Sequence, residues 1–427
     1  MTTVSQYPLS RAERAASQLF LLALFAVAFS TALTNVFVGL AYLSFLLALA
    51  SSAPLRALLR QPRTLLPGLL ALLLLALYLL AVSWTVAPRA DVLTALKKYS
   101  RLLILPMVIV LAWRDERLPR RALTYCLAGL GVLLASIYLT SVGLMPSSSL
   151  GWWRVSADTR DAFVFRNHIS IGILLGFASS AALLIASHAR RTSSRVLALA
   201  AAVLAALPIM FLSQGRTGFV VLLVGLITVF LLRVRLTPLR VVVALAALTL
   251  AALAVYATSA NVKSRTDDMI NEIAHDKVQS PNGLRVSFIA VGLRAFAAHP
   301  LIGVGTGGFA EVYAPTAKRN WPAGSELALA RHQPHSEFML VAVQLGALGL
   351  LVYFAMLTSL ARAAAAARRT FAGDILIVLL AIYIFTSAFN SLLWDTTEAH
   401  WFLLLAGCLY VGARRQAQGA LAAASSA

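Results

Sequence analysis

A very short turn holds the first side chain suited to chemistry on an anion. The turn, Ser213-Gln214-Gly215-Arg216-Thr217-Gly218, joins two long apolar runs, so Arg216 is kept at the membrane surface or slightly within it. A guanidinium at that depth is costly unless it reaches the headgroups or meets an anion. Arg216 therefore predicts either contact with lipid phosphates or an anion site. Four further basic residues could share that site: Lys97, Lys98, Arg101 and Arg285.

Two histidines close the longest segment that connects two apolar runs. The sequence Arg331-His332-Gln333-Pro334-His335-Ser336-Glu337 comes just before a long apolar stretch. Histidines at i and i+3 could hold a metal, but Pro334 separates them and no third clustered ligand is evident. A histidine at such a boundary is otherwise often a polar interfacial residue. The pattern predicts no metal site, and it leaves the role of His335 open at this point.

A glycine-rich run lies upstream of these histidines. Gly303, Gly305 and Gly308 have the G-x-G-x-x-G spacing of a dinucleotide-binding fingerprint. That fingerprint needs a strand before it and a helix after it, whereas a predicted helix precedes this one. We therefore reject the nucleotide interpretation. Two interpretations remain, a tight turn or a nest of backbone amides near a phosphate.

Composition sets the environment in which these residues must work. Of the 427 residues, 60% are hydrophobic and 12% are charged, against about 25% charged residues in a soluble domain. The chain is therefore predicted to be a membrane protein. The net charge of +20 does not indicate nucleic acid binding, because no block of five or more Lys or Arg occurs. Cys126 and Cys408 lie in apolar runs and predict neither a disulfide nor a metal site.

Apolar runs of membrane-spanning length recur along the chain. A helix rises about 1.5 Å per residue, so about 20 apolar residues cross the hydrocarbon core. The sequence predicts an all-α polytopic membrane protein with about twelve transmembrane helices. The runs are 15–33, 36–53, 64–84, 93–113, 122–145, 169–187, 194–213, 217–232, 238–258, 336–360, 371–391 and 400–414. The first could instead be a cleaved signal peptide, but it is longer than a normal signal-peptide core.

Charge predicts the orientation. With a cytoplasmic N-terminus, the short inside segments carry 20 of the 36 Lys and Arg but only 4 of the 16 Asp and Glu. This distribution follows the positive-inside rule, and an even number of spans puts both termini in the cytoplasm. The predicted units are spans one to nine (1–258), a periplasmic helical loop (259–335), spans ten to twelve (336–414) and a cytoplasmic tail (415–427). A shorter outer loop, 146–168, carries Arg154, Arg160 and Arg166.

The long outer loop is predicted to be helical. Apolar residues at near-helical spacing over 262–276 indicate a helix at the membrane interface. Ser280-Pro281-Asn282 is a helix-start signal, and His299-Pro300 ends the helix that follows. Its expected packing face carries Leu284, Phe288, Val291 and Phe296. Because a loop of this length in a compact protein is usually functional, we expect the active site on this face of the membrane.

The order of these motifs resembles the O-antigen ligase superfamily, which comprises O-antigen ligases, O-antigen polymerases and protein O-oligosaccharyltransferases. The resemblance covers nearly the whole chain. The segments that carry it are Ser83-Trp84 to Pro88, Lys97-Lys98-Tyr99, Arg154, Arg166-Asn167-His168, Ser213-x-Gly215-Arg216-Thr217-Gly218, Arg285, Pro300-Leu301-Ile302-Gly303-Val304-Gly305 and His335. One departure is that the family often has Asn and an aromatic residue after the histidine, where this chain has Ser336-Glu337-Phe338.

The resemblance implies a reaction. A glycan on undecaprenyl pyrophosphate is transferred, on the periplasmic face of the bacterial inner membrane, to a sugar hydroxyl of the lipid A-core oligosaccharide. Lipopolysaccharide biosynthesis is thus the implied pathway, and the donor, the acceptor and membrane lipids are the expected partners. The implied enzyme is a metal-independent, inverting glycosyltransferase that needs no cofactor. Its fold is expected to resemble the GT-C type of membrane glycosyltransferase.

The resemblance also implies roles for particular residues. Arg216 and Arg285 are expected to bind the pyrophosphate, since arginine makes paired hydrogen bonds to phosphate oxygens. His335 is expected to activate the acceptor hydroxyl, because imidazole is a suitable base near neutral pH. Whether Glu311 or Glu337 assists it stays open. Weaker candidates for pyrophosphate contacts are Arg154, Arg160, Arg166, Lys97, Lys98 and Arg101.

Length and loop sizes favour the ligase within this superfamily. The chain leaves no room for the appended soluble domain that protein O-oligosaccharyltransferases usually have. Polymerases tend to show two sizeable outer loops, whereas one of the two here spans only 146–168. A transporter or flippase is the alternative of a different class. It predicts charged residues deep within several spans, and the apolar runs are nearly free of them.

Overall fold

The computed structural model describes most of the chain. The described residues are 8–150, 153–158, 161–213, 215–234, 281–322 and 331–425, with 237, 246, 249–250, 253–260, 262–264, 266–267 and 271 between them. The ninth predicted span, 238–258, and the interfacial helix predicted over 262–276 therefore lie mostly outside the described residues. So does Arg160, one of the arginines predicted to contact pyrophosphate.

The described part is a bundle of helices. Its first half contains α1 (Arg11–Ala26), α2 (Thr31–Ser51), α3 (Ala53–Leu59), α4 (Pro62–Leu80), η1 (Ala81–Trp84), α5 (Arg89–Tyr99), η2 (Ser100–Leu103), α6 (Ile104–Arg114), α7 (Leu118–Ser141), β1 (Ser148–Leu150) and β2 (Trp153–Val155). Its second half contains α8 (His168–His188), α9 (Thr192–Phe211), α10 (Arg216–Arg233), α13 (Pro281–Ala298), α14 (Phe309–Asn320), α15 (Glu337–Ala366), α16 (Phe371–Ser387) and α17 (Thr396–Ser425).

The helices have the character of a polytopic membrane protein. Among the described residues, seven helices are long and apolar enough to cross a membrane, the longest being Glu337–Ala366. Each predicted span other than the ninth overlaps a described helix. The all-α membrane class is thus confirmed, whereas the count of twelve and the GT-C likeness stay predictions. Large apolar side chains on the outside of the bundle, such as Leu43 and Leu47 of α2, are exposed as lipid-facing residues would be.

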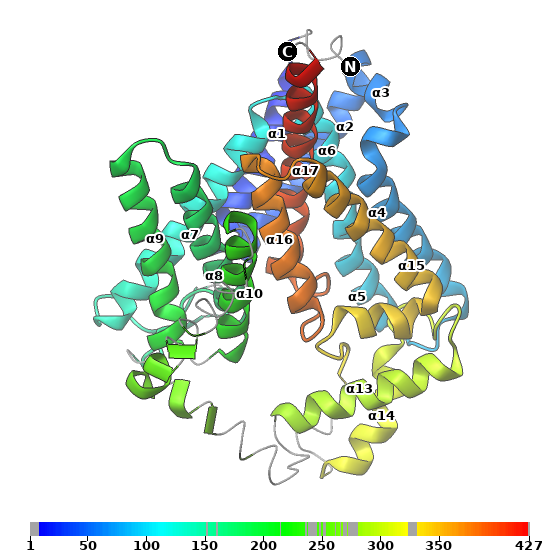
Figure 1. Cartoon of the computed structure of the whole chain (residues 1–427). Helices are drawn as coiled ribbons and strands as arrows, with labels where there is room; N and C mark the ends of the chain where they lie inside the picture. Colours follow the sequence, from blue (N-terminus) through cyan, green and yellow to red (C-terminus); the bar gives the residue numbers. More distant parts are fainter. Residues whose placement is uncertain are drawn as a thin grey trace.

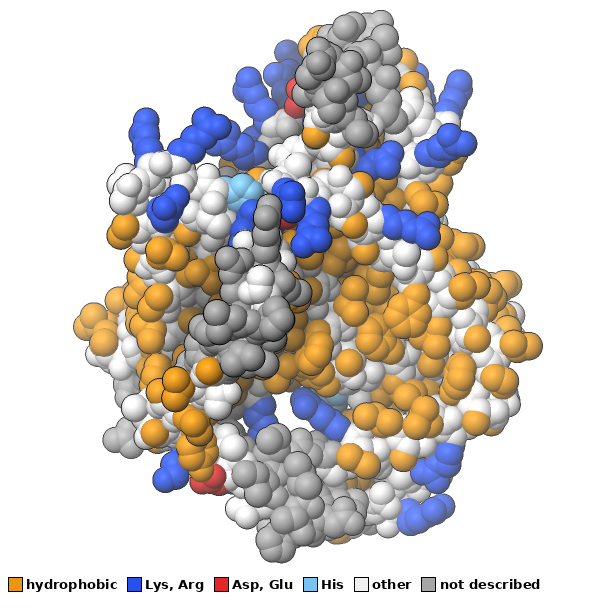
Figure 2. Space-filling view, viewed as in Figure 1, with side chains coloured by type: hydrophobic (Ala, Val, Ile, Leu, Met, Phe, Trp, Pro, Cys, Tyr) orange, Lys and Arg blue, Asp and Glu red, His pale blue; other side chains and the backbone are white. Residues whose placement is uncertain are grey.

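One end of the bundle carries many basic side chains. The lobe formed by α13 and α14 lies at the end opposite the C-terminal part of α17 (Figure 1). Lys and Arg side chains gather around the α17 end, and a belt of hydrophobic side chains follows below them (Figure 2). This is the arrangement that the positive-inside rule predicts. The periplasmic position of the α13–α14 lobe and the cytoplasmic position of the termini remain predictions.

Two elements differ from the sequence-based expectation. The fourth span was expected as one helix over 93–113, but the chain forms α5, a 3-10 turn and α6 instead. At this break the ring of Tyr99 stacks on that of Tyr78 of α4, with centroids 3.6 Å apart. The outer loop 146–168, for which no strand was predicted, contains a small antiparallel hairpin, with Ser148 opposite Val155. Three-residue strands leave too short an alternation to be recognised in a sequence.

The glycine-rich run fills a break in α15. Gly346 interrupts this helix with φ 63° and ψ −158°. The carbonyls of Val343 and Gln344 accept hydrogen bonds from the amides of Val304 (2.8 Å) and Gly305 (3.0 Å). On the other side of the break, the amides of Ala347 and Leu348 donate to the carbonyls of Pro300 (2.8 Å) and Leu301 (3.1 Å). Irregular backbone at membrane depth is tolerated when it is paired within the protein in this way.

This pairing decides between the two interpretations of the glycine run. A Cβ on Gly303 would lie 2.5 Å from the Val343 carbonyl oxygen, and one on Gly305 would lie 2.3 Å from the Cα of Thr85. Both glycines also have positive φ, which L side chains rarely adopt. The amides of the run bond to other protein groups, including that of Gly307 to the Gln344 side chain at 2.8 Å. The run is a tight, buried turn, and the phosphate-nest interpretation is wrong.

Candidate active site

Three predicted site residues from distant parts of the chain are close enough to influence one another. Burial lowers the pKa of Arg285, and the positive charge of Arg216 lowers it further. Burial lowers the pKa of His335 from 6.5 to about 4, with further contributions from the charges of Arg285 and Arg331. These interactions link the first turn of α10, the first half of α13 and the segment that leads into α15. The two guanidinium groups repel each other, and the imidazole near Arg285 is neutral at physiological pH.

The tight packing of the turn before α10 positions Arg216. Arg216 is the first residue of α10 and follows Gly215 as N-cap. A Cβ on Gly215 would lie 2.9 Å from the Cβ of His168, and one on Gly172 of α8 would lie 2.5 Å from the Cα of Gly218. The glycines therefore let α8 and α10 approach closely enough for their backbones to touch. This close approach fixes the base of the Arg216 side chain on the rigid start of a helix.

Arg285 is carried by a helix whose other side packs into the protein. On α13, Phe288 and Val291 are buried, as the predicted packing face requires. The ring of Phe288 meets that of Tyr313 of α14 edge to face, with centroids 4.7 Å apart. Arg285 lies one turn before Phe288, so packing of this face sets the position of the guanidinium. Figure 2 shows the molecule hollowed between the α13–α14 lobe and the bundle, with Lys and Arg side chains at the opening.

His335 has an unusual backbone conformation at the entrance to α15. Its φ is +51°, in the left-handed region that costs a residue other than glycine about 1–3 kcal/mol. Its ring centroid lies 5.9 Å from that of Phe288 of α13. The next residue, Ser336, is the N-cap of α15 and accepts a hydrogen bond from the amide of Met339 at 3.3 Å. The imidazole is thus held between the start of a long helix and the face of α13.

Glu311 and Glu337, the two carboxylates that could assist His335 as a base, differ in burial. Glu337 is fully buried and accepts a hydrogen bond from the amide of Leu393 at 2.8 Å. Glu311 lies on the exposed side of the first turn of α14. His332, three residues before His335, is exposed and lies 3.6 Å from a carboxylate oxygen of Asp91. Of the two carboxylates, Glu337 is the one joined to the chain segment that contains His335.

Two arginines of the outer loop, Arg154 and Arg166, were weaker candidates for pyrophosphate contacts, and their environments differ. Arg166 is partly buried and donates to the hydroxyl of Thr31 and, at 2.8 Å, to the carbonyl of Val27. Burial lowers its pKa to about 10, and the Glu398 carboxylate opposes that shift. Arg154 is exposed and its guanidinium lies over the ring of Phe163, 5.9 Å from the centroid. Arg166 therefore joins the loop to the bundle, whereas Arg154 faces solvent.

The basic residues of α5 and η2 contact the connection between α16 and α17. The Lys98 ammonium donates to the carbonyl of Trp394 at 3.0 Å, and Arg101 donates to the same carbonyl at 3.2 Å. Arg101 also donates to the hydroxyl of Thr396 at 2.7 Å. Lys97 points to the exposed side of the same helix. The structure thus gives Lys98 and Arg101 a role in holding residues 388–395 in place, and their contact with pyrophosphate stays a prediction.

One pair of residues near Arg216 was not singled out from the sequence as part of a site. The Nδ1 atom of His168 lies 3.5 Å from a carboxylate oxygen of Asp161 and 3.4 Å from the hydroxyl of Ser213. These contacts bring the outer loop against the turn that holds Arg216. The only signal in the sequence was His168 in the Arg-Asn-His segment of the resemblance. Asn167 of that segment caps α8, accepting from the amide of Ser170 at 2.8 Å.

Comparison with known protein families finds a match over the region that contains Arg216, Arg285 and His335. Residues 200–354 match the family model described as O-antigen ligase. Over these residues the chain is similar to the O-antigen ligase superfamily. The match includes Arg216, Arg285 and His335, and it also includes the glycine run that fills the break in α15. None of the curated proteins compared with the chain matches it significantly.

The family-model match covers only part of the candidate site. It does not extend to Lys97, Lys98, Arg101, Arg154 or Arg166, which lie before residue 200. Within the described part of the chain, no group of three or more His, Cys, Asp or Glu side chains could hold a metal ion. What the site offers chemically is a pair of arginines, Arg216 and Arg285, that repel each other, and a neutral imidazole near Arg285.

Proposed function

We propose that the protein is an O-antigen ligase. It transfers a glycan from undecaprenyl pyrophosphate to a sugar hydroxyl of the lipid A-core oligosaccharide, on the periplasmic face of the inner membrane. One observation carries this proposal. Within the region that matches the superfamily, Arg216 and Arg285 are close enough to repel each other, and a neutral His335 lies beside Arg285.

The arginine pair suits the pyrophosphate of the donor. Two like charges held close together are costly without an anion, and an anion between them relieves that repulsion. Each guanidinium can also make paired hydrogen bonds to phosphate oxygens. The negative charge on the leaving pyrophosphate grows as the glycosidic bond breaks. Fixed positive charge in a partly dry site therefore stabilises the transition state more than the ground state, by several kcal/mol.

The imidazole suits the acceptor hydroxyl. His335 accepts the proton of the hydroxyl as its oxygen attacks the anomeric carbon, and the bond from that carbon to the pyrophosphate oxygen breaks. The electron pair of the broken bond stays on the pyrophosphate oxygen, whose negative charge Arg216 and Arg285 stabilise. Attack opposite to the leaving group inverts the anomeric centre. A histidine whose pKa is about 4 is already unprotonated at neutral pH, which is the form that a base requires.

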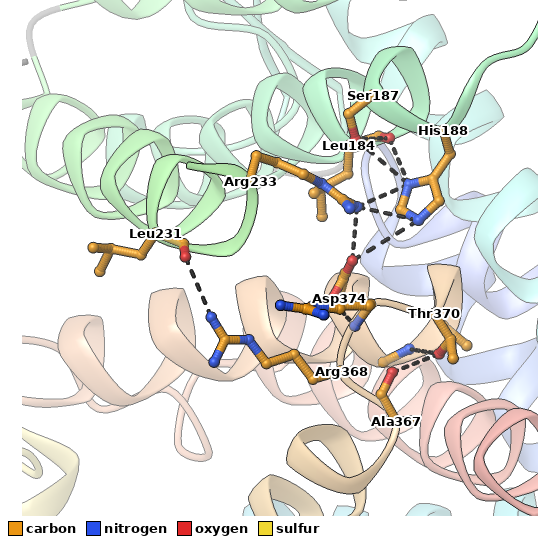
Figure 3. A network of polar contacts seen from close by, with 12 residues as sticks. Leu184, Ser187, His188, Leu231, Arg233, Ala367, Arg368, Thr370 and Asp374 are labelled. Atoms are coloured by element: carbon orange, nitrogen blue, oxygen red, sulfur yellow. Dashed lines mark hydrogen bonds and ion pairs between the residues drawn. The ribbon is translucent and has the colours of Figure 1, made fainter. Parts of the chain in front are cut away.

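The buried charges in the spans bear on the transporter alternative. A transport path predicts charged residues along several spans. In the described residues, the buried acids of the spanning helices lie in first turns, as Asp374 does in α16. Asp374 accepts a hydrogen bond from Arg233 at the end of α10 at 2.7 Å and lies 3.8 Å from His188 of α8 (Figure 3). Such contacts tie helix ends together, and they support the enzyme rather than the transporter.

A reconstituted transfer assay tests the proposal. Purified protein receives a lipid-linked glycan and lipopolysaccharide that carries only lipid A and core. We expect glycan-bearing lipopolysaccharide with the wild type, also in excess chelator, and a loss of at least about 100-fold in Arg216→Ala and Arg285→Ala. Arg294→Ala is the matched control, because Arg294 lies exposed on the same helix as Arg285. Lengthening of the lipid-linked glycan instead of transfer to the core would identify a polymerase.

A further inference from the structure

Helix α13 exposes a second apolar face that its packing does not use. Val286, Ile289 and Leu293 are 66%, 41% and 55% exposed. Their spacing of three and four residues puts them on one stripe of the helix. The buried residues Phe288 and Val291 lie on a different side, against α14 and α15. We refer to Val286, Ile289 and Leu293 as the α13 stripe.

Contacts with α15 place the middle of α13 at a defined depth. A Cβ on Gly292 would lie 2.4 Å from the Sδ atom of Met339 and 3.5 Å from the side chain of Val343. The apolar part of α15 ends near Arg362. About 20 residues span the hydrocarbon core, so counting back from Arg362 puts its other boundary near residue 342. The middle of α13 is therefore level with this boundary of the membrane.

The apolar surface continues from the α13 stripe into the lipid-facing surface of α15. Leu301 and Ile302, just after α13, are exposed, and the Leu301 carbonyl accepts a hydrogen bond from the amide of Leu348 at 3.1 Å. Leu348 comes about six residues after the same boundary, on the membrane side of it. Leu348 and Leu351 of α15 are themselves exposed apolar residues. Exposed leucines at this depth would meet the hydrocarbon core of the membrane.

We propose that α13 is an interfacial helix whose α13 stripe lies among the lipid acyl chains of the adjacent leaflet, with Leu301 and Ile302 anchored deeper. Arg285 precedes Val286 directly, so the same anchoring holds Arg285 at the depth of lipid phosphates. Arg294, on the side of α13 away from the stripe, is exposed and faces water. The helix that carries Arg285 is thereby fixed to the membrane surface. This proposal concerns membrane contact only and does not depend on the ligase chemistry.

Fluorescence in lipid nanodiscs tests the proposal with a matched pair of positions. Single cysteines at Ile289→Cys and Arg294→Cys are labelled with a polarity-sensitive fluorophore, and the native Cys126 and Cys408 are both buried. We expect emission from position 289 to shift to shorter wavelength. Lipids with a nitroxide on the acyl chain should quench it at least about threefold more strongly than they quench the label at position 294. Aqueous iodide should show the opposite preference.

Two outcomes would overturn the proposal. Equal iodide quenching at both positions would put the α13 stripe in water. Short-wavelength emission at position 289 without quenching by lipid nitroxide would mean that protein, such as a second copy of the chain, covers the stripe. If the Ile289→Cys variant is poorly folded, labelling of Leu293→Cys gives an independent measurement on the same stripe. The elution profile of the nanodisc sample shows whether the variant is folded. Transfer activity is not used as a readout, so failure of the proposed ligase function would leave the result intact.

Discussion

The buried carboxylate of Glu337 and the backbone of Leu393 hold two chain segments together. Glu337 accepts a hydrogen bond from the Leu393 amide at 2.8 Å, and its own amide donates to the carbonyl of Asn390 at 3.1 Å. Lys98 and Arg101 also hold this connection between α16 and α17, through the carbonyl of Trp394. His335 lies two residues before Glu337, so this arrangement fixes the segment that carries the imidazole.

Replacing Glu337 tests that arrangement. Glu337→Ala leaves the buried Leu393 amide without its acceptor, which should lower the free energy of unfolding by about 1–3 kcal/mol. Glu337→Gln keeps an acceptor oxygen and should remain close to the wild type in thermal stability. Thermal unfolding in detergent and the transfer rate are both measured. If Glu337→Gln keeps its stability but loses transfer, Glu337 takes a direct part in the reaction and is more than a positioning residue.

Removal of the imidazole should separate binding from transfer. A positioned general base contributes about 10²–10⁴-fold in rate, so His335→Ala should lose transfer by that factor while still binding the lipid-linked donor. His332→Ala is the control and should be mild, because His332 is exposed and its neighbour is Asp91. Donor binding and transfer are measured on the same preparations. Loss of donor binding in His335→Ala would instead make His335 a binding residue.

The pH dependence of transfer should reflect the low pKa of His335. Burial and the charges of Arg285 and Arg331 lower this pKa from 6.5 to about 4. Because the unprotonated form is the base, kcat/KM should stay level from pH 7 to about pH 5 and fall as the pH approaches 4. Arg331→Gln removes one positive charge, so it should move the acid limb to higher pH. A wild-type limb near pH 6.5 that does not move in Arg331→Gln would contradict this assignment.

The glycine run should tolerate no side chain where it meets α15. Gly303→Ala places a Cβ 2.5 Å from the backbone of α15 at a positive φ, so this variant should be strongly destabilised or fail to accumulate. Gly143→Ala is the control, since Gly143 also has positive φ but a Cβ there would meet no atom within 4 Å. It should cost only about 1 kcal/mol. Thermal unfolding of both variants is measured. Equal stability of the two variants would mean that the break in α15 does not depend on close packing of the glycine-rich run.

Cysteine labelling tests the orientation. Lys318 on α14 and Arg120 on α7 are both exposed, at opposite predicted sides of the membrane. Lys318→Cys should react with a membrane-impermeant reagent in intact cells whose outer membrane has been made permeable. Arg120→Cys should react only after lysis. The reverse pattern would place the α13–α14 lobe, and with it the candidate site, in the cytoplasm.

The amino-acid sequence determined those features that local patterns encode. Apolar runs of about 20 residues predict the membrane class whatever the tertiary contacts are, because each span must satisfy its own backbone in lipid. The short turn around Arg216 and the spacing of Phe288 and Val291 likewise predicted a fixed arginine and the packing face of α13. His335 was identified by its place at the start of an apolar run together with the resemblance.

Only the tertiary structure decided how these parts meet. Helical periodicity carries no information about which helix lies against which, so the approach of Arg216 and Arg285 and the neutral state of His335 could not be derived from spacing. The break in α15 at Gly346 gives no local signal, because a single glycine is also tolerated in an unbroken helix. The exposure of the α13 stripe likewise could not be predicted from the sequence. Val286, Ile289 and Leu293 are as apolar as core residues, and only the packing of Phe288 on a different side leaves them facing outward.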